Sequence, residues 1–439
     1  MFKIKRVLIL GAAGRDFHNF LCKYKKNKNH KVVAFTQAQI PGIAKRKFPK
    51  ELAGKLYNRD IPFYPEEKLS ELIKKFKVDE VVFAYSDVSH EYVMHLASIA
   101  LANGADFILL GPKSTMIKSN KKVISVCAVR TGSGKSQTSR KIGSLLKDFG
   151  YKVVAIRHPM PYGDLIKQRV QRFADYDDLK RNDATIEERE EYEPWISKNI
   201  VVYAGVDYGE ILRRAEKEAD VIIWDGGNND LPFYYPDLHI VVVDPHRAGH
   251  ELKYHPGEAN FRMADVIIIN KIDSAKKEDI EIVKENIKRY NPEAKVILAR
   301  SDIIVDDPKA INNRNVLVVE DGPTLTHGGM SFGAGTIAAK ENKAKSIVDA
   351  QKYAYGSIKD VYKKYPHLKR VLPAMGYGKK QIKELEKTIN KAKCDLIIDG
   401  SPVNIRRLIK VNKPVLNVDY ELGKGAVDEL RIILKKFLK

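Results

Sequence analysis

Short apolar runs recur along most of the chain, and each is followed by a polar or glycine-containing turn and then by a helical pattern. The first four are RVLIL (6–10), HKVVAFT (30–36), DEVVFAY (79–85) and ADFILL (105–110). Runs of this length that alternate with helices are typical of parallel strands buried on both faces. The sequence therefore predicts an α/β fold built on doubly wound parallel sheets.

The pattern divides the chain into three predicted parts. Residues 1–118 should form a Rossmann-like sheet. Residues 119–305 begin with KKVISVCAV (121–129) and add apolar runs at 151–157, 219–225, 238–244, 264–270 and 294–299. Residues 306–439 contain NVLVVED (315–321), a helical pattern at 377–392 and a late strand–helix–strand after residue 394. This last part is either a C-terminal α/β region of its own or the completion of the second sheet.

Composition excludes several classes of protein. The 439 residues are 30% charged and 44% hydrophobic, which is globular and argues against global disorder. No apolar run has the roughly 18–20 residues that a membrane span needs. The basic start resembles a signal peptide, but its apolar part is only VLIL before a glycine turn, which indicates a first strand. Three widely spaced cysteines fit neither a disulfide framework nor a metal site, so we expect a cytoplasmic protein.

The net charge of +21 has three interpretations: a nucleic-acid surface, a highly anionic small substrate, or bland solvation by a lysine-rich surface. Nucleic-acid binders concentrate their charge in a stripe or tail with interleaved aromatic residues. Here the lysines are spread along helical segments and mixed with acids. We therefore expect no nucleic-acid partner, while charge alone does not decide between the other two.

A phosphate-binding loop is predicted where the run VISVCAV leads into a glycine turn and a helix. Backbone amides of such a turn bind phosphate oxygens, a lysine reaches the β- and γ-phosphates, and a hydroxyl binds Mg²⁺. The usual first glycine is replaced by Val129. The alternative to a phosphate-binding loop is a glycine turn that only connects the strand to the helix. The predicted nucleotide-binding residues of this loop are Thr131, Gly132, Ser133, Gly134, Lys135, Ser136 and Gln137.

Two later strands end in residues that suit the same nucleotide. ADVIIWDGG places Asp225 at a strand end, where it would hold Mg²⁺ together with Ser136; the alternative is an Asp that starts a turn. ADVIIINKID places Asn270, Lys271 and Asp273 after another strand. A carboxylate at Asp273 accepts both hydrogens of the guanine N1–N2 edge, a donor pair that adenine lacks.

Three further loops are unusually polar, and two follow strands whose carboxyl ends should carry ligands. The predicted substrate-binding residues of these loops are Arg157, His158, Asp164, His250, His327, Gly328 and Gly329. The same loops contain His246 and Arg247, which we expect to act in catalysis together with Lys135 and Asp225. The alternative for each loop is a turn with solvated basic residues.

The first part of the chain has its own glycine loop, GAAGRD, after the first strand. GxxG is shorter than the dinucleotide fingerprint and strand two does not end in an acidic residue, so we do not expect NAD. Gly11, Gly14 and Arg15 are instead predicted to bind a phosphate or an acidic substrate. The run 86–90 closes another strand at the same edge and either caps that site or begins a helix through Ser86 or Asp87.

The strings GAAGRDFHNF, AVRTGSGKSQTSR, WDGGNND, DPHRAGHE, NKID and EDGPTLTHGGM resemble, nearly end to end, the cyclic 2,3-diphosphoglycerate synthetases and related predicted GTPases. That group is similar to the SIMIBI branch of P-loop enzymes. The resemblance implies a Mg²⁺-dependent ligase in which ATP drives closure of the phosphoanhydride of 2,3-bisphosphoglycerate. It also implies cations at the strand ends to offset the charge of two polyanions.

Two questions stay open at the level of sequence. The resemblance implies ATP, whereas the segment 270–273 indicates GTP. The alternative to a ligase is a regulatory or metallochaperone-type GTPase with a protein partner, but the isolated cysteines do not suit a metallochaperone. A homo-oligomer is compatible with the sequence.

Overall fold

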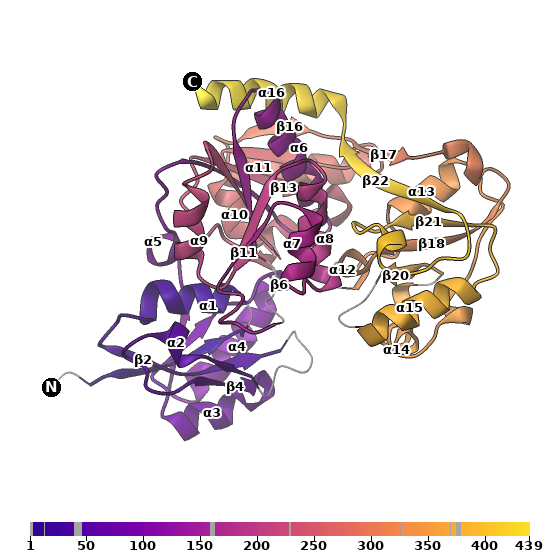
Figure 1. Cartoon of the computed structure of the whole chain (residues 1–439). Helices are drawn as coiled ribbons and strands as arrows, with labels where there is room; N and C mark the ends of the chain where they lie inside the picture. Colours follow the sequence, from indigo (N-terminus) through magenta and orange to yellow (C-terminus); the bar gives the residue numbers. More distant parts are fainter. Residues whose placement is uncertain are drawn as a thin grey trace.

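The computed structural model describes residues 3–12, 14–38, 46–158, 163–227, 230–326, 329–368, 370–374 and 379–439. Three sheets follow one another along the chain, each covered by helices (Figure 1). The predicted α/β class with parallel sheets is confirmed. No helix in the described ranges is long and apolar enough to cross a membrane. All three cysteines are free.

The first sheet has six strands in the order β3-β4-β2-β1-β5-β7, and all its pairs are parallel except β3 with β4. The inner part of β1 is fully buried because hydrophobic residues cover both of its faces. The strands are β1 Lys5–Leu10, β2 His30–Gln37, β3 Lys47–Phe48, β4 Ile61–Pro65, β5 Glu80–Phe83 and β7 Asp106–Leu109, and the helices are α1 Arg15–Asn19, α2 Lys50–Ala53, α3 Leu69–Phe76, α4 His90–Ala102 and α5 Pro112–Thr115.

The second sheet has eight strands in the order β10-β11-β9-β12-β8-β13-β15-β16. Only the β10–β11 pair is antiparallel, so the carboxyl ends of the other strands share one edge. The strands are β8 Lys122–Ala128, β9 Val153–Arg157, β10 Val170–Phe173, β11 Val201–Gly205, β12 Val221–Asp225, β13 Leu238–Val243, β15 Val266–Ile269 and β16 Lys295–Leu298, and the helices are α6 Lys135–Asp148, α7 Tyr176–Arg181, α8 Ile186–Ile196, α9 Tyr208–Ala215, α10 Gly257–Met263 and α11 Lys277–Tyr290.

The third sheet runs β17-β22-β21-β18-β19, with β20 paired to β18. Its strands are β17 Ser301–Val305, β18 Asn315–Asp321, β19 Ser346–Ile347, β20 Leu372–Ala374, β21 Leu396–Gly400 and β22 Val415–Leu422, and its helices are α12 Gly322–Thr326, α13 Ala334–Glu341, α14 Ile358–Lys364 and α15 Lys379–Lys391. The last helix, α16 Lys424–Leu438, leaves this sheet and crosses to the second one (Figure 1). Its residues Leu430 and Leu434 are fully buried in the core beneath β8 and α6.

A small antiparallel sheet joins the first and second parts of the chain. β6 Val88–Ser89 pairs with β14 Tyr254–His255. The backbone amide of His90 adds a hydrogen bond to the carbonyl of Lys253, at 2.9 Å. The polar segment after β5 is thereby fixed against the sheet that carries the phosphate loop.

Candidate active site

The predicted phosphate loop lies between the buried strand β8 and helix α6. Gly134 has a φ of +104°, and a Cβ atom on it would lie 2.0 Å from the side-chain nitrogen of Asn270. Only glycine satisfies both conditions, because a side chain disfavours this φ and there is no space for one. The loop therefore has the strand–turn–helix geometry that phosphate binding requires.

Lys135 and Asp225 form a buried ion pair at the start of this helix. Lys135 Nζ lies 2.7 Å from Asp225 Oδ1, and the other carboxylate oxygen lies 2.5 Å from Arg157 Nη1 and 3.2 Å from Trp195 Nε1. Burial alone would raise the pKa of Asp225, but Arg157 and Lys135 outweigh it and hold that pKa below its ordinary value. Burial, with the charge of Arg157, lowers the pKa of Lys135 to about 8.

The segment after β15 holds the phosphate loop from the opposite side to Asp225. Asn270 Nδ2 donates to the carbonyl of Ser133 at 2.9 Å, and Lys271 Nζ donates to the carbonyl of Gly132 at 2.7 Å. Asp273 accepts the backbone amide of Ser301 at 2.8 Å. Asn270 and Lys271 thus contact the phosphate loop directly, Asp273 contacts the backbone at the start of β17, and its role in reading the base stays a prediction.

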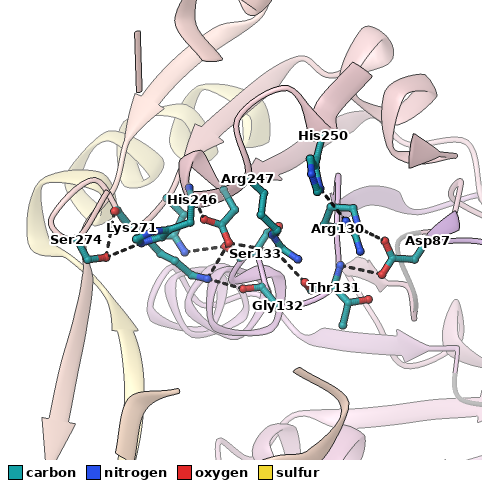
Figure 2. Close-up of polar contacts among 12 residues, drawn as sticks. Asp87, Arg130, Thr131, Gly132, Ser133, His246, Arg247, His250, Lys271 and Ser274 are labelled. Carbon is teal, nitrogen blue, oxygen red and sulfur yellow. Dashed lines mark hydrogen bonds and ion pairs between the residues drawn. The ribbon is translucent and has the colours of Figure 1, made fainter. Parts of the chain in front are cut away.

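Asp244 directly follows β13 and contacts two residues that hold the phosphate loop, Lys271 and Arg247. Figure 2 shows these two side chains beside the loop. Asp244 accepts Lys271 Nζ at 2.9 Å and Arg247 Nη2 at 3.1 Å. The same Arg247 nitrogen donates to the carbonyl of Thr131 at 2.8 Å. His246 Nε2 lies 3.0 Å from the hydroxyl of Ser274. Arg247 thus supports the loop backbone.

A cavity of about 580 Å³ opens between the phosphate loop and the third sheet. Its Lys and Arg side chains, within the described ranges, all come from residues before 306: Arg130, Lys135, Arg140, Arg157, Lys271 and Arg300. The wall built by residues after 306 contributes four carboxyl side chains and no described Lys or Arg; these are Glu320, Asp321, Glu341 and Asp419. The wall before residue 306 also carries four carboxyl side chains, from Glu190, Glu191, Asp273 and Asp302. Positive charge therefore exceeds negative charge on the phosphate-loop wall, and the wall after residue 306, here called the acidic wall, has carboxyl groups without described Lys or Arg side chains.

Glu320 is buried and binds the backbone of the segment that leads into α13. Its carboxylate accepts the backbone amides of Gly333, Gly335 and Thr336, and the Thr336 hydroxyl, at 2.7–3.2 Å. The residue is 1% exposed, and burial raises its pKa to about 7 despite these hydrogen bonds. Glu320 thereby fixes the start of α13, whose first residues line the cavity.

The structure brings only some of the predicted site residues to this cavity. Those that line it are Thr131, Gly132, Gly134, Lys135, Ser136, Gln137, Arg157, His246, Lys271 and Asp273. Ser133, Asp225, Arg247 and Asn270 lie directly behind them and contact the loop or its lysine. His327 and Gly328 lie outside the described residues. Asp164 accepts the amides of Ile166 and Lys167 in a surface turn, and Gly329 is exposed.

The glycine loop of the first part of the chain faces the second sheet. A Cβ atom on Gly14 would lie 1.8 Å from His158 Nε2, so the close approach requires glycine. Arg15 is buried and donates to the carbonyl of Leu231 at 3.0 Å and the Thr115 hydroxyl at 3.1 Å. Gly11, whose amide donates to the Thr36 carbonyl, lies beside them. Their predicted substrate role stays a prediction, and the contacts seen here join the two parts of the chain.

Sequence reasoning missed two residues that contact the site. Trp195, in α8, donates to Asp225, and Glu191 of the same helix pairs with Arg157. Asp87, which the sequence suggested as a cap of the first glycine loop or of a helix, instead reaches the phosphate loop. No local signal identifies these contacts, because each is made between segments that are distant in sequence.

Residues 200–299 match the family model described as cyclic 2,3-diphosphoglycerate synthetase, P-loop domain. Over 437 residues the chain is 64% identical to arginine synthetase ArcE of Thermococcus kodakarensis, covering 100% of this chain and 98% of that protein. Cyclic 2,3-diphosphoglycerate synthetase of Thermococcus sibiricus is 32% identical over 88 residues, 20% of each chain. The ATP complex of LpxK from Aquifex aeolicus is 12% identical and covers 84% of this chain and 100% of its own, with a TM-score of 0.44. The chain belongs to the cyclic 2,3-diphosphoglycerate synthetase-like family of P-loop proteins, together with this arginine synthetase.

Proposed function

We propose that the chain is a nucleoside-triphosphate-dependent ligase that forms arginine. The observation that carries this proposal is the distribution of charge in the cavity. All its described Lys and Arg side chains lie on the phosphate-loop wall, together with four carboxyl side chains, and the wall after residue 306 carries four carboxyl side chains and no described Lys or Arg. Phosphates belong on the first wall, and a substrate with an ammonium or guanidinium group belongs on the second. The end-to-end identity to an arginine synthetase supports the same reaction.

The chemistry follows from what must change in the substrate. A precursor with a ureido oxygen where arginine carries nitrogen has a poor leaving group. Transfer of the γ-phosphoryl group to that oxygen releases the nucleoside diphosphate. Attack by a nitrogen nucleophile such as ammonia at the same carbon then expels inorganic phosphate and, after loss of a proton, leaves the guanidinium. Lys135 and Arg157 would offset the charge on the transferred group.

Mg²⁺ fits the hard oxygen ligands at this site. The Ser136 hydroxyl lines the cavity, and Asp225 lies behind it, bound to Lys135. Within the described ranges there is no group of three or more His, Cys, Asp and Glu that could hold a metal by itself. That suits Mg²⁺, which usually takes one or two protein ligands and completes its shell with phosphate oxygens and water. When bound, it would neutralise charge on the β- and γ-phosphates.

The nucleotide base would lie near Asp273, Arg300 and Ser301, which line the same cavity. Asp273 is held by the Ser301 amide, so its carboxylate is oriented before the nucleotide binds. That carboxylate favours guanine over adenine. We therefore propose that the protein accepts GTP in preference to ATP.

Closure of the phosphoanhydride of 2,3-bisphosphoglycerate is the second candidate. It is favoured by the family-model match to residues 200–299, which covers strands of the nucleotide-binding sheet. The acidic wall lies outside the matched segment, and it is poorly suited to a substrate with two phosphates.

The reverse reaction tests the first candidate without knowledge of the precursor. Purified protein is incubated with Mg²⁺, arginine, inorganic phosphate and either ADP or GDP, and triphosphate formation is followed by phosphorus NMR. We expect triphosphate that depends on arginine, is not supported by lysine, and is absent with Lys135→Ala. Triphosphate formation without a requirement for arginine, or none at all, would reject arginine formation. A parallel sample with 2,3-bisphosphoglycerate and ATP or GTP would show a cyclic anhydride signal if the second candidate is correct.

A further inference from the structure

The phosphate loop of this chain begins without its usual glycine. Val129 occupies that position, and Arg130 follows it. Val129 is buried and its amide donates to the carbonyl of Val242 at 3.1 Å. A Cβ atom on Gly257 would lie 2.4 Å from the Val129 carbonyl oxygen, so α10 packs tightly against this point. The start of the loop is therefore held by its surroundings and not by a flexible turn.

Asp87, in the first part of the chain, contacts the start of the phosphate loop at Arg130 and Thr131 (Figure 2). One of its carboxylate oxygens lies 2.6 Å from Arg130 Nε, and the other accepts the backbone amide of Thr131 at 3.2 Å. The side chains of Asp87 and Arg130 are each 9% exposed. A buried carboxylate that accepts from two successive residues fixes both the side chain and the backbone at the first turn of the loop.

Arg130 is fixed on its other sides as well. Its guanidinium lies 3.6 Å from the ring centre of Tyr254, and Nη1 lies 2.7 Å from His250 Nδ1. Burial, followed by the charge of Arg130, lowers the pKa of His250 to about 4, so a neutral imidazole accepts this hydrogen bond at neutral pH. Tyr254 belongs to β14, the strand that pairs with β6 directly after Asp87.

The backbone at Asp87 is unusual in a way that supports a specific role. Its φ is +59°, a left-handed conformation that Asp tolerates better than most residues but that still costs free energy. The next two residues are held in β6 by the pairing with β14. The fold thus maintains a strained residue at a position where the first part of the chain reaches the phosphate loop.

We propose that Asp87 is a positioning residue of the nucleotide site. It acts through Arg130 and the Thr131 amide, and it makes the Rossmann-like part of the chain a component of the phosphate-binding machinery. The proposal rests on nucleotide binding by the loop, and not on the identity of the acceptor substrate. The alternative that Ser86 or Asp87 begins a helix is wrong, because Ser89 caps α4 and Asp87 binds the phosphate loop.

The test is nucleotide affinity in the full-length protein, measured by titration calorimetry with Mg²⁺ and either ATP or GTP. Asp87→Asn keeps the shape of the side chain and removes its charge. Loss of a charge-assisted contact of this kind should weaken nucleotide binding about tenfold or more. The matched control is Glu91→Gln, four residues on, whose side chain is 82% exposed and pairs only with His95 among its described neighbours. It should bind nucleotide as the wild type does.

A second variant separates positioning from a purely structural role. Arg130→Lys removes the guanidinium from the other end of the contact, and the double variant should weaken binding by less than the product of the two single effects. Independent effects that multiply, or a lower melting temperature with unchanged nucleotide affinity, would overturn the inference. So would normal affinity in Asp87→Asn, and in that case nucleotide binding by the loop would still stand. A wild-type protein that binds neither nucleotide would overturn both proposals.

Discussion

Replacing Asp225 by asparagine tests whether its carboxylate is the counter-charge that a nucleotide phosphate replaces at Lys135. In the structure the Asp225 carboxylate is 1% exposed and pairs with both Lys135 and Arg157. Arg157 has a second acidic partner in Glu191, whereas Asp225 is the only acidic partner of Lys135 among the described ion pairs. Asparagine keeps an acceptor for Trp195 Nε1 but leaves the buried ammonium group without a counter-charge.

The size of the effect follows from that burial. Removal of one partner from a buried ion pair costs about 3–5 kcal/mol, because the other charge is left unpaired. For a folding unit of about 150–250 residues, this corresponds to a fall in melting temperature of about 6–20 °C. A bound triphosphate restores the missing negative charge. In the wild type the lysine must first leave Asp225, whereas in the variant it is already unpaired.

The assay is thermal unfolding of wild type and Asp225→Asn, with and without nucleotide, in the absence of Mg²⁺. We expect the nucleotide to raise the melting temperature of the variant more than that of the wild type, although turnover with Mg²⁺ is lost in the variant. Lys135→Ala is the matched control: it breaks the same pair but should gain little from nucleotide. Equal or smaller stabilisation of Asp225→Asn than of the wild type would refute the exchange of Asp225 for phosphate.

The other predictions concern the base, the loop and the acidic wall. Asp273→Asn should weaken GTP binding at least tenfold and ATP binding much less, measured by calorimetry, since the carboxylate selects the guanine edge; equal losses would contradict that role. Arg247→Ala removes the hydrogen bond to the Thr131 carbonyl and should raise the KM for nucleotide about tenfold with little change for the acceptor; the opposite pattern would place Arg247 at the acceptor. Glu320 has a raised pKa, so its stabilising contribution is complete below about pH 4.5 and is lost as pH rises through about 7. Glutamine cannot ionise, so the stability of Glu320→Gln relative to wild type should rise by about 3 kcal/mol between these two pH values. The measurement is the difference in melting temperature between variant and wild type at each pH, and a constant difference would argue against protonation of Glu320.

Much of the fold could be predicted from local pattern. The runs at 6–10, 121–129, 219–225 and 264–270 correspond to β1, β8, β12 and β15, because a parallel strand covered on both faces must be apolar along its length. β11 was not predicted, since VVYAG is short and lies between polar helices. β4 was not predicted either, and its sequence IPFYP contains two prolines, which weaken a strand assignment.

The site was predictable where one segment contains the whole chemical signal. The glycine turn with Lys135, and the segment from Asn270 to Asp273, each consist of a few consecutive residues, and the structure brings them into contact. Trp195 could not be found in this way, and Asp87 could be named only as a possible cap. Each gains its contact with the site because the chain folds it against a segment dozens of residues away, Trp195 against Asp225 and Asp87 against Arg130.

The net charge of the chain does not predict the charge of the substrate. A chain with a net charge of +21 suggests an anionic ligand, and the phosphate-loop wall of the cavity agrees with that expectation. Yet net charge sums the whole surface, whereas recognition depends on the field inside one cavity, where low-dielectric walls focus it. The wall that carries Asp321, Glu341 and Asp419, beside the buried Glu320, has the opposite sign to the chain as a whole. If the chain forms arginine, as we propose, a basic protein would bind a cationic substrate at the one wall of its cavity that has carboxyl groups and no described Lys or Arg side chains.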